Sequence, residues 1–225
     1  MSPMSREAFA LLPLLLALEG CGSPPAPAEA SPSIQLTAIR ASDVRIDGEL
    51  DEPAWASAEI SPRFVDAATG EPTTPYTEAR ALFDDEALTL ALYGADEDVR
   101  STDRMGAILH APGGGTFVVE IDPGGEIHWH APSAASGPPP EGVRAAVDAD
   151  ATLDQDDLDD EEWIAEIRIP WRALGMDGPG DVRANFFRRD QPRGSLARSL
   201  AWAPWHERPT ASLDTLGVIH CAPRS

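Results

Sequence analysis

Hydrophobic and polar residues alternate along much of the chain, which is the period of β-strands that bury one face. Segment 163–169 is the strongest strand signal, and Pro170 ends it. Segments 77–83 and 87–93 are predicted to form a hairpin around the acidic turn 84–86. Its second strand carries Leu88, Leu90 and Leu92 on the inner face. The first elements predicted are therefore short, paired strands.

A second hairpin is predicted around the turn Asp-Pro-Gly-Gly at 122–125. Alternation places Phe117, Val119, Ile121, Ile127 and Trp129 on one face of this hairpin. The opposite face then carries Glu120, His128 and His130.

Further strands are expected at 34–39, 44–48, 143–147, 182–189, 199–203 and 216–221. A short helix should begin near Pro53 and carry Trp55, and one helical turn is expected at 170–174. About ten short strands, separated by turn signals and joined by one or two short helices, are typical of an all-β antiparallel β-sandwich of jelly-roll or immunoglobulin-like type.

Composition narrows the function classes. The chain has 225 residues, the length of one ordinary domain with additional tails, and a formal net charge of -21. Such a charge repels phosphate backbones, so nucleic acid is not an expected partner. Every basic residue apart from histidine is arginine, and the absence of lysine excludes Schiff-base chemistry and a Walker A lysine.

The N-terminus has the pattern of an export signal. The apolar run 8–18 is too short to span a bilayer and has the length of a signal-peptide core. The sequence Leu-Glu-Gly-Cys at 18–21 resembles a bacterial lipobox, from which Glu19 departs. We expect a lipoprotein-type signal peptide at 1–20, lipidation at Cys21, and a Pro/Ala-rich linker at 21–33.

This organisation predicts an exported protein in which the lipid anchor alone contacts the membrane. The chain is then outer-membrane-anchored or periplasmic, or secreted if the signal is of the plain secretory type. Lipidation of Cys21 would leave Cys221 without a partner within the chain. The folded domain is expected at 34–221.

Several motifs occur in an order that resembles carbohydrate-binding module family 9. They are IDGELDEPAW at 46–55, ALFDDEALTLALYGAD at 81–96, FVVEIDPGG at 117–125, EEWIAEIRIPWRALG at 161–175, RANFFRRD at 183–190 and WAPWHERP at 202–209. The resemblance implies a β-sandwich that binds polysaccharides or oligosaccharides such as xylan by aromatic stacking, often beside glycoside hydrolases. We therefore expect a non-catalytic module that assists polysaccharide degradation.

A sugar site needs an exposed aromatic ring beside hydrogen-bonding side chains. Trp202, Trp205 and His206 lie in a proline-bounded segment and are the leading candidates. Trp129 is a weaker one, because alternation places it on the core face. Arg188 is the predicted polar partner and Asn185 the second. Trp55 and Trp163 are expected in the core, whereas the pattern does not decide between core and surface for Trp171.

Alternative functions remain at this stage. The sandwich could be an envelope scaffold that has lost its sugar site. Because relatives of this sandwich bind haem b, it could also transfer electrons, with Met105, Met176 or histidines as axial ligands. No metal site is expected from His128 and His130, which lack a recognisable third ligand, although the resembled family can bind structural calcium. Glycosidase activity would require a carboxylate pair, for which Glu120 and Glu166 are candidates.

Overall fold

The computed structural model describes residues 34–113, 115–131, 137–155, 160–205 and 213–221. The predicted signal peptide, the linker, Cys21 and His206 lie outside these residues. Within them the chain forms thirteen strands, one α-helix and two 3-10 helices. No helix in these ranges has the length and apolar character needed to cross a membrane.

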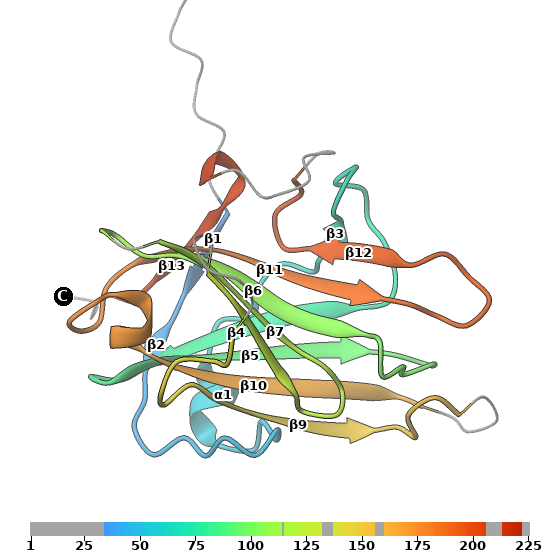
Figure 1. Cartoon of the computed structure of the whole chain (residues 1–225), viewed down its shortest axis with the longest axis horizontal. Helices are drawn as coiled ribbons and strands as arrows, with labels where there is room; N and C mark the ends of the chain where they lie inside the picture. The colour runs from blue at the N-terminus through green and yellow to red at the C-terminus, as the bar shows by residue number, and fades with distance from the viewer. Residues whose placement is uncertain (1–33, 114, 132–136, 156–159, 206–212, 222–225) are drawn as a thin grey trace, which may run out of the picture. The chain divides into compact units, whose positions relative to one another are not determined.

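The strands form two sheets (Figure 1). Six strands of the eight-stranded sheet follow the order β1 (Gln35–Thr37), β13 (Gly217–His220), β11 (Val182–Asp190), β6 (Arg104–His110), β7 (Thr116–Ile121) and β8 (Ile127–His130). The other two lie off this path: β12 (Arg198–Ala201) pairs with β11, and β3 (Val65–Asp66) pairs with β12. The five-stranded sheet has the order β2 (Ile39–Arg40), β4 (Thr77–Phe83), β5 (Ala87–Ala95), β10 (Glu162–Pro170), β9 (Arg144–Asp150). The helix is α1 (Pro53–Ser57), and the 3-10 helices are Trp171–Leu174 and Leu213–Thr215.

The predicted β-sandwich is confirmed, with one correction: both sheets are mixed. Strand β1 runs parallel to β13, and β2 runs parallel to β4. The N-terminal segment therefore pairs with one sheet and, two residues later, with the other. All other strand pairs are antiparallel.

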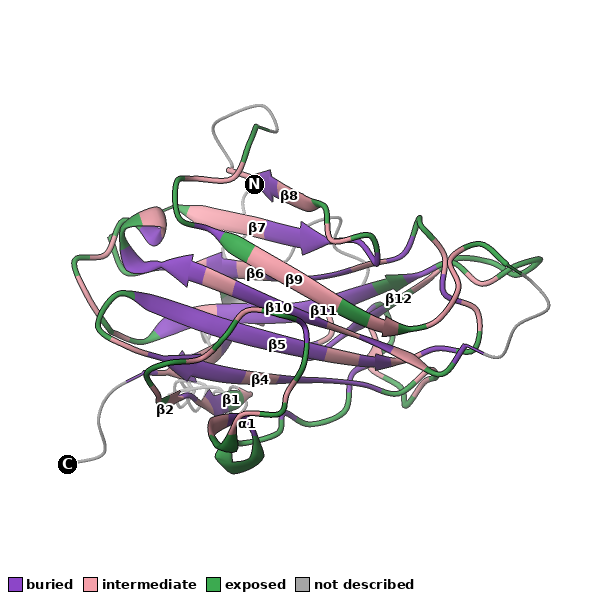
Figure 2. Ribbon diagram, turned by 90° about the horizontal axis from the view of Figure 1, so that it is seen from below, coloured by how far each residue is buried: buried purple, intermediate pink, exposed green. Residues whose placement is uncertain are grey.

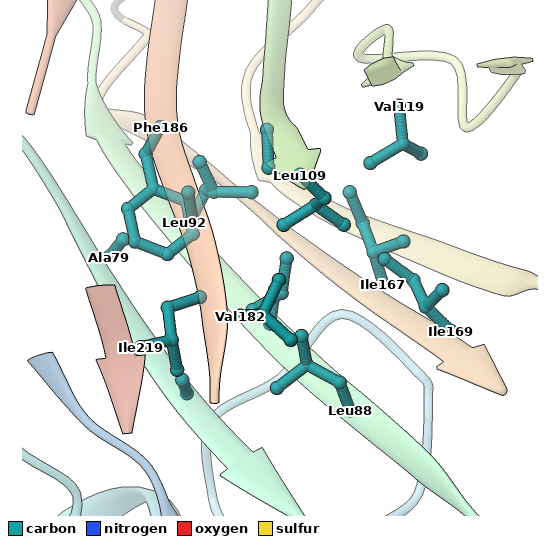
Figure 3. Close-up of a cluster of buried hydrophobic side chains, with 14 of the residues drawn as sticks. Ala79, Leu88, Leu92, Leu109, Val119, Ile167, Ile169, Val182, Phe186 and Ile219 are labelled. Atoms are coloured by element: carbon teal, nitrogen blue, oxygen red, sulfur yellow. The ribbon is translucent and has the colours of Figure 1, made fainter. Parts of the chain in front are cut away.

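The core lies between the two sheets, and Figure 3 shows side chains from both meeting there. Leu88 and Ile169 are cross-strand partners on β5 and β10, as are Leu90 and Ile167. All four side chains have no exposed surface. Figure 2 shows buried residues concentrated along β4, β5, β6, β10 and β11. Burial of these apolar side chains is the main term that stabilises the sandwich.

A second apolar cluster lies outside the five-stranded sheet, where Trp55 of α1 packs on Leu82 and Ala91. Glu166 of β10 is wholly buried beneath it. One oxygen of Glu166 accepts bonds from the backbone N–H groups of Asp47 at 3.0 Å and Gly48 at 2.9 Å, and the other accepts the indole N–H of Trp55 at 2.8 Å. Burial raises the pKa of Glu166 to about 7, against the effect of these donors.

The expected strand at 44–48 is wrong because this segment bonds to the Glu166 side chain and pairs with no strand. Gly48 has φ 93°, and a Cβ there would lie 2.3 Å from the backbone nitrogen of Asp148. Glycine is required for this close approach. Strands β3 and β6 were not predicted, whereas the 77–83 strand has the expected bounds.

Candidate functional site

Tryptophans are the first place to look for a stacking surface, and five of the six are buried. The exposed fractions are 0% for Trp55, 5% for Trp129, 0% for Trp163, 2% for Trp171 and 1% for Trp202. Trp205 alone is partly exposed. The core positions expected for Trp55 and Trp163 are confirmed.

Trp202 and Trp129 are core residues, which differs from their prediction as sugar-stacking candidates. The Trp202 ring lies 5.3 Å from the ring of Phe186, between the sheets. Trp129 packs against Phe117 at 5.5 Å, as its position in the strand alternation implied. A sugar could reach either ring only if the core opened.

Arg188 also points into the core and reaches across it to the five-stranded sheet. Its guanidinium donates to the Ala95 carbonyl at 2.8 Å, to Asp96 at 2.6 Å and to Asp190 at 2.9 Å. The side chain has no exposed surface. The prediction that it contacts sugar is therefore at odds with its position. Its role is to neutralise two buried carboxylates.

This buried network perturbs the neighbouring acids. Burial raises the pKa of Asp103 to about 6, and Asp96 is shifted in the same direction for the same reason. Asp190 is shared with Arg198, whose Nε donates to it at 2.8 Å. The network joins the ends of β5, β6, β11 and β12 beneath the surface.

Asn185 faces the opposite side of β11 and fixes the loop that leads to Trp205. Its side-chain amide donates to the Ala203 carbonyl at 2.7 Å and accepts from the Ala203 N–H at 2.9 Å. The backbone N–H of Trp205 donates to the Ala67 carbonyl at 2.8 Å. Asn185 has no exposed surface, and its side chain holds the backbone of the loop two residues before Trp205.

The outer side of the eight-stranded sheet beside this loop, which we call the Trp205 face, presents Trp205, Arg189 and His130 to solvent. It also includes Phe187 and Glu120, which are only 2% and 7% exposed. Trp205 packs its ring edge-on to Phe187 at 6.5 Å. Arg189 lies over the Phe187 ring at 5.5 Å and forms an ion pair with Glu120 at 2.8 Å. His130 lies 3.4 Å from the other oxygen of Glu120.

The lack of a side chain at Gly106 allows the Phe187 ring to lie against the sheet. In the sheet register Phe187 is opposite Gly106, which is opposite Glu120. A Cβ on Gly106 would lie 2.1 Å from the Val119 carbonyl oxygen and 3.1 Å from the Phe187 ring. Without that atom, Phe187 lies across β6.

The Trp205 face combines the groups that a pyranose ring requires. An aromatic ring packs on the C–H face of a sugar, and guanidinium, imidazole and carboxylate groups bond to its hydroxyls. The side chain of Arg189 is 60% exposed and that of His130 is 40% exposed, so both can reach a ligand. Phe187 and Arg189 were missed by the sequence reasoning, although alternation along β11 places them with Asn185.

A separate cavity of about 690 Å³ is lined in part by Tyr76, a residue that is 38% exposed. Two of its carboxylates are already engaged: Asp160 accepts the backbone N–H groups of Val99 and Thr152, and Asp96 binds Arg188. This cavity therefore offers fewer free polar groups than its lining suggests.

The two methionines considered as haem ligands lie in different surroundings. Met105 is wholly buried on β6, and its sulfur lies close to Gly94 of the opposite sheet. Met176 follows the 3-10 helix at 171–174 and lines a cavity of about 490 Å³ with Trp171 and Arg172.

No protein-family model matches the sequence, and no curated protein matches it. Solved structures do resemble the fold. A Bacteroides uniformis protein proposed to bind carbohydrate has 15% identity and a TM-score of 0.63 over 84% of this chain and 99% of its own. A family 9 carbohydrate-binding module from Caldicellulosiruptor kristjanssonii, in complex with cellotriose, has 14% identity and a TM-score of 0.61 over 85% of this chain and 95% of its own.

The complex of a family 9 module from the same organism with glucose has 15% identity and a TM-score of 0.59 over 85% of this chain and 97% of its own. The chain therefore has the fold of these carbohydrate-binding modules.

Proposed function

We propose that this protein binds glycans, without catalysis, through the Trp205 face. The proposal rests on the position of Trp205: it is the one tryptophan outside the core, and it packs on Phe187, over which the exposed Arg189 also lies. Modules of the same fold are seen with cellotriose and with glucose, which supports a sugar as the ligand.

The proposed contacts divide the work between stacking and hydrogen bonding. Trp205 presents an apolar ring on a backbone held by the Asn185–Ala203 bonds and by the bond from its own backbone N–H to Ala67, so less conformational entropy is lost on binding. Arg189 and His130 donate to ring hydroxyls, and Glu120, which is nearly buried between them, orients both side chains.

Binding without hydrolysis is supported by the surroundings of the two acids considered for catalysis. Glu166 has no exposed surface, and both of its oxygens are bonded to N–H groups. Glu120 lies on the other sheet and is paired with Arg189. A glycosidase needs two carboxylates flanking one bond, an arrangement that these two residues do not form.

We further propose that the protein is exported, carries lipid on Cys21 and assists polysaccharide degradation at the cell envelope. The basis is the lipobox-like sequence at 18–21 and the linker after it. Metabolic labelling with a fatty-acid analogue should label the wild-type chain and leave Cys21→Ser unlabelled. Equal labelling of both would contradict the lipid anchor.

A glycan array probed with the full chain tests the binding proposal. The expected result is retention on a defined set of neutral glycans such as xylan or cellulose oligosaccharides. Trp205→Ala should lose this signal and keep the wild-type circular dichroism spectrum. A blank array from a folded wild-type chain would contradict glycan binding and favour an envelope scaffold.

A further inference from the structure

The turn between β7 and β8 gathers three side chains of metal-ligating type. Asp122 directly follows β7, Glu126 directly precedes β8, and His128 is the second residue of β8. One ligand atom from each lies within 4.8 Å of the other two. Strand alternation in the sequence does not show that the two carboxylates lie near His128, because it is the turn that brings the three side chains together.

The turn is held in shape by its own backbone. The Asp122 N–H donates to the Glu126 carbonyl at 3.2 Å, and the Gly125 N–H donates to the Asp122 carbonyl at 2.9 Å. The Glu126 N–H donates to Asp122 Oδ1 at 2.9 Å. Asp122 Oδ1 is thus committed to the turn, whereas Oδ2 is directed at His128.

We propose that Asp122, Glu126 and His128 bind a zinc-class divalent transition metal. Nε2 of His128 lies 3.5 Å from Asp122 Oδ2. This distance is long for a hydrogen bond, but two ligands of a tetrahedral zinc ion, at about 2.0–2.1 Å from the metal, lie about 3.3 Å apart. Small side-chain rotations of the exposed Glu126 would bring its carboxylate to the same separation.

The donor set selects the class of ion. Imidazole nitrogen is a good ligand for zinc, copper and nickel, whereas calcium and magnesium prefer sites built of oxygen alone. Three protein ligands would leave a coordination position for water or another group.

Arg104 is the competing cation at this site. Its Nη2 lies 3.9 Å from Asp122 Oδ2. Its Nη1 donates to the carbonyls of Ser101 at 2.8 Å and Asp103 at 2.6 Å, so the side chain keeps these partners if a metal takes the carboxylate. Removal of the Arg104 guanidinium should therefore strengthen metal binding at Asp122. If Asp122 served only as the ion-pair partner of Arg104, the same change would only remove a favourable contact.

The buried triad Asp96, Asp103 and Asp190 also has metal-ligating geometry. Its carboxylates are not free to hold a metal, because the guanidinium of Arg188 already bonds two of its members.

Zinc titration calorimetry on the tag-free full chain tests the assignment. Wild type should bind one zinc ion, and His128→Ala and Glu126→Gln should each weaken binding at least about tenfold, since loss of even an outer partner of a ligand costs 10–100-fold. Arg104→Gln should tighten it. His130→Ala is the matched control, because His130 lies two residues along the same strand face and pairs with Glu120.

Three results would overturn the proposal. They are the absence of zinc binding by the folded wild type, binding that His128→Ala leaves unchanged, and a loss in His130→Ala equal to that in His128→Ala. Calcium binding without zinc binding would likewise show that the imidazole is no ligand. Circular dichroism of each variant separates loss of a ligand from loss of the fold.

Discussion

Arg188 and Arg189 are neighbours in sequence on opposite faces of β11, and their substitution by alanine should have very different effects on stability. Arg188→Ala leaves Asp96 and Asp190, exposed by 5% and 2%, without the guanidinium that bonds both. Removing one partner of a buried ion pair costs about 3–5 kcal/mol. In a domain of this size that loss lowers the melting temperature by roughly 10 °C.

Arg189→Ala removes a side chain that is 60% exposed, and its partner Glu120, whose side chain is 9% exposed, keeps His130 at 3.4 Å. Its cost should be below about 1 kcal/mol. Urea unfolding of the full chain, followed by tryptophan fluorescence and circular dichroism, measures both free energies of unfolding.

Two milder variants test the same buried network if Arg188→Ala does not fold. Arg188→Met retains the apolar stem volume, and adding Asp96→Asn removes the carboxylate left without a cation. The double variant should be more stable than Arg188→Met alone. If Arg188→Ala is as stable as Arg189→Ala and loses glycan binding, Arg188 belongs to the ligand site and the buried network is wrong.

Four further predictions follow from the packing. Trp202→Ala should cost about 3–5 kcal/mol of unfolding free energy in urea, because it empties a core position. Asn185→Ala leaves the Ala203 N–H and carbonyl without their side-chain partner, so it should cost about 2 kcal/mol and also weaken glycan binding in calorimetry. Gly48→Ala should cost at least about 2 kcal/mol in thermal melts, since it strains φ 93° and places a Cβ 2.3 Å from a backbone nitrogen. Burial raises the pKa of Glu166 from 4.5 to about 7, so the native chain holds a proton that the unfolded chain releases in this range. The protonated Glu166 contributes up to about 3 kcal/mol to the unfolding free energy, and this contribution is present below pH 4.5 and is lost as the pH rises to 7. Glu166→Gln should therefore reduce the difference in unfolding free energy between pH 5 and pH 7.5, measured by urea titration.

Strict alternation made most strands predictable, and its loss explains the strands that were missed. Strand β6 carries Met105, Ala107 and Leu109 toward the core, but Gly106 and Ile108 between them are also apolar. Its outer face is covered by Phe187, so the period of two is hidden. The segment 44–48 has a strand-like composition, yet its backbone bonds go to Glu166, a partner more than a hundred residues away.

The candidate site was predicted in part. Trp205 and Asn185 lie where the loop and strand patterns suggested, whereas Arg188 and Trp202 belong to the core. Strand alternation could have placed Arg188 in the core, because Val182, Ala184 and Phe186, at the other even-numbered positions of β11, face inward. An arginine on a core face needs buried carboxylates, and although Asp190 lies two residues along the same strand, no local pattern shows that Asp96 supplies the other.

The most direct test of glycan binding at the Trp205 face is calorimetric titration of the best array glycan into wild type, Trp205→Ala and Tyr76→Ala. Tyr76 is the matched control, since it is an exposed aromatic residue beside the other cavity. Stacking on Trp205 predicts at least a tenfold loss of affinity, about 1.4 kcal/mol, for Trp205→Ala and wild-type affinity for Tyr76→Ala. Wild-type affinity in Trp205→Ala with loss in Tyr76→Ala would contradict it and place the ligand in the Tyr76 cavity.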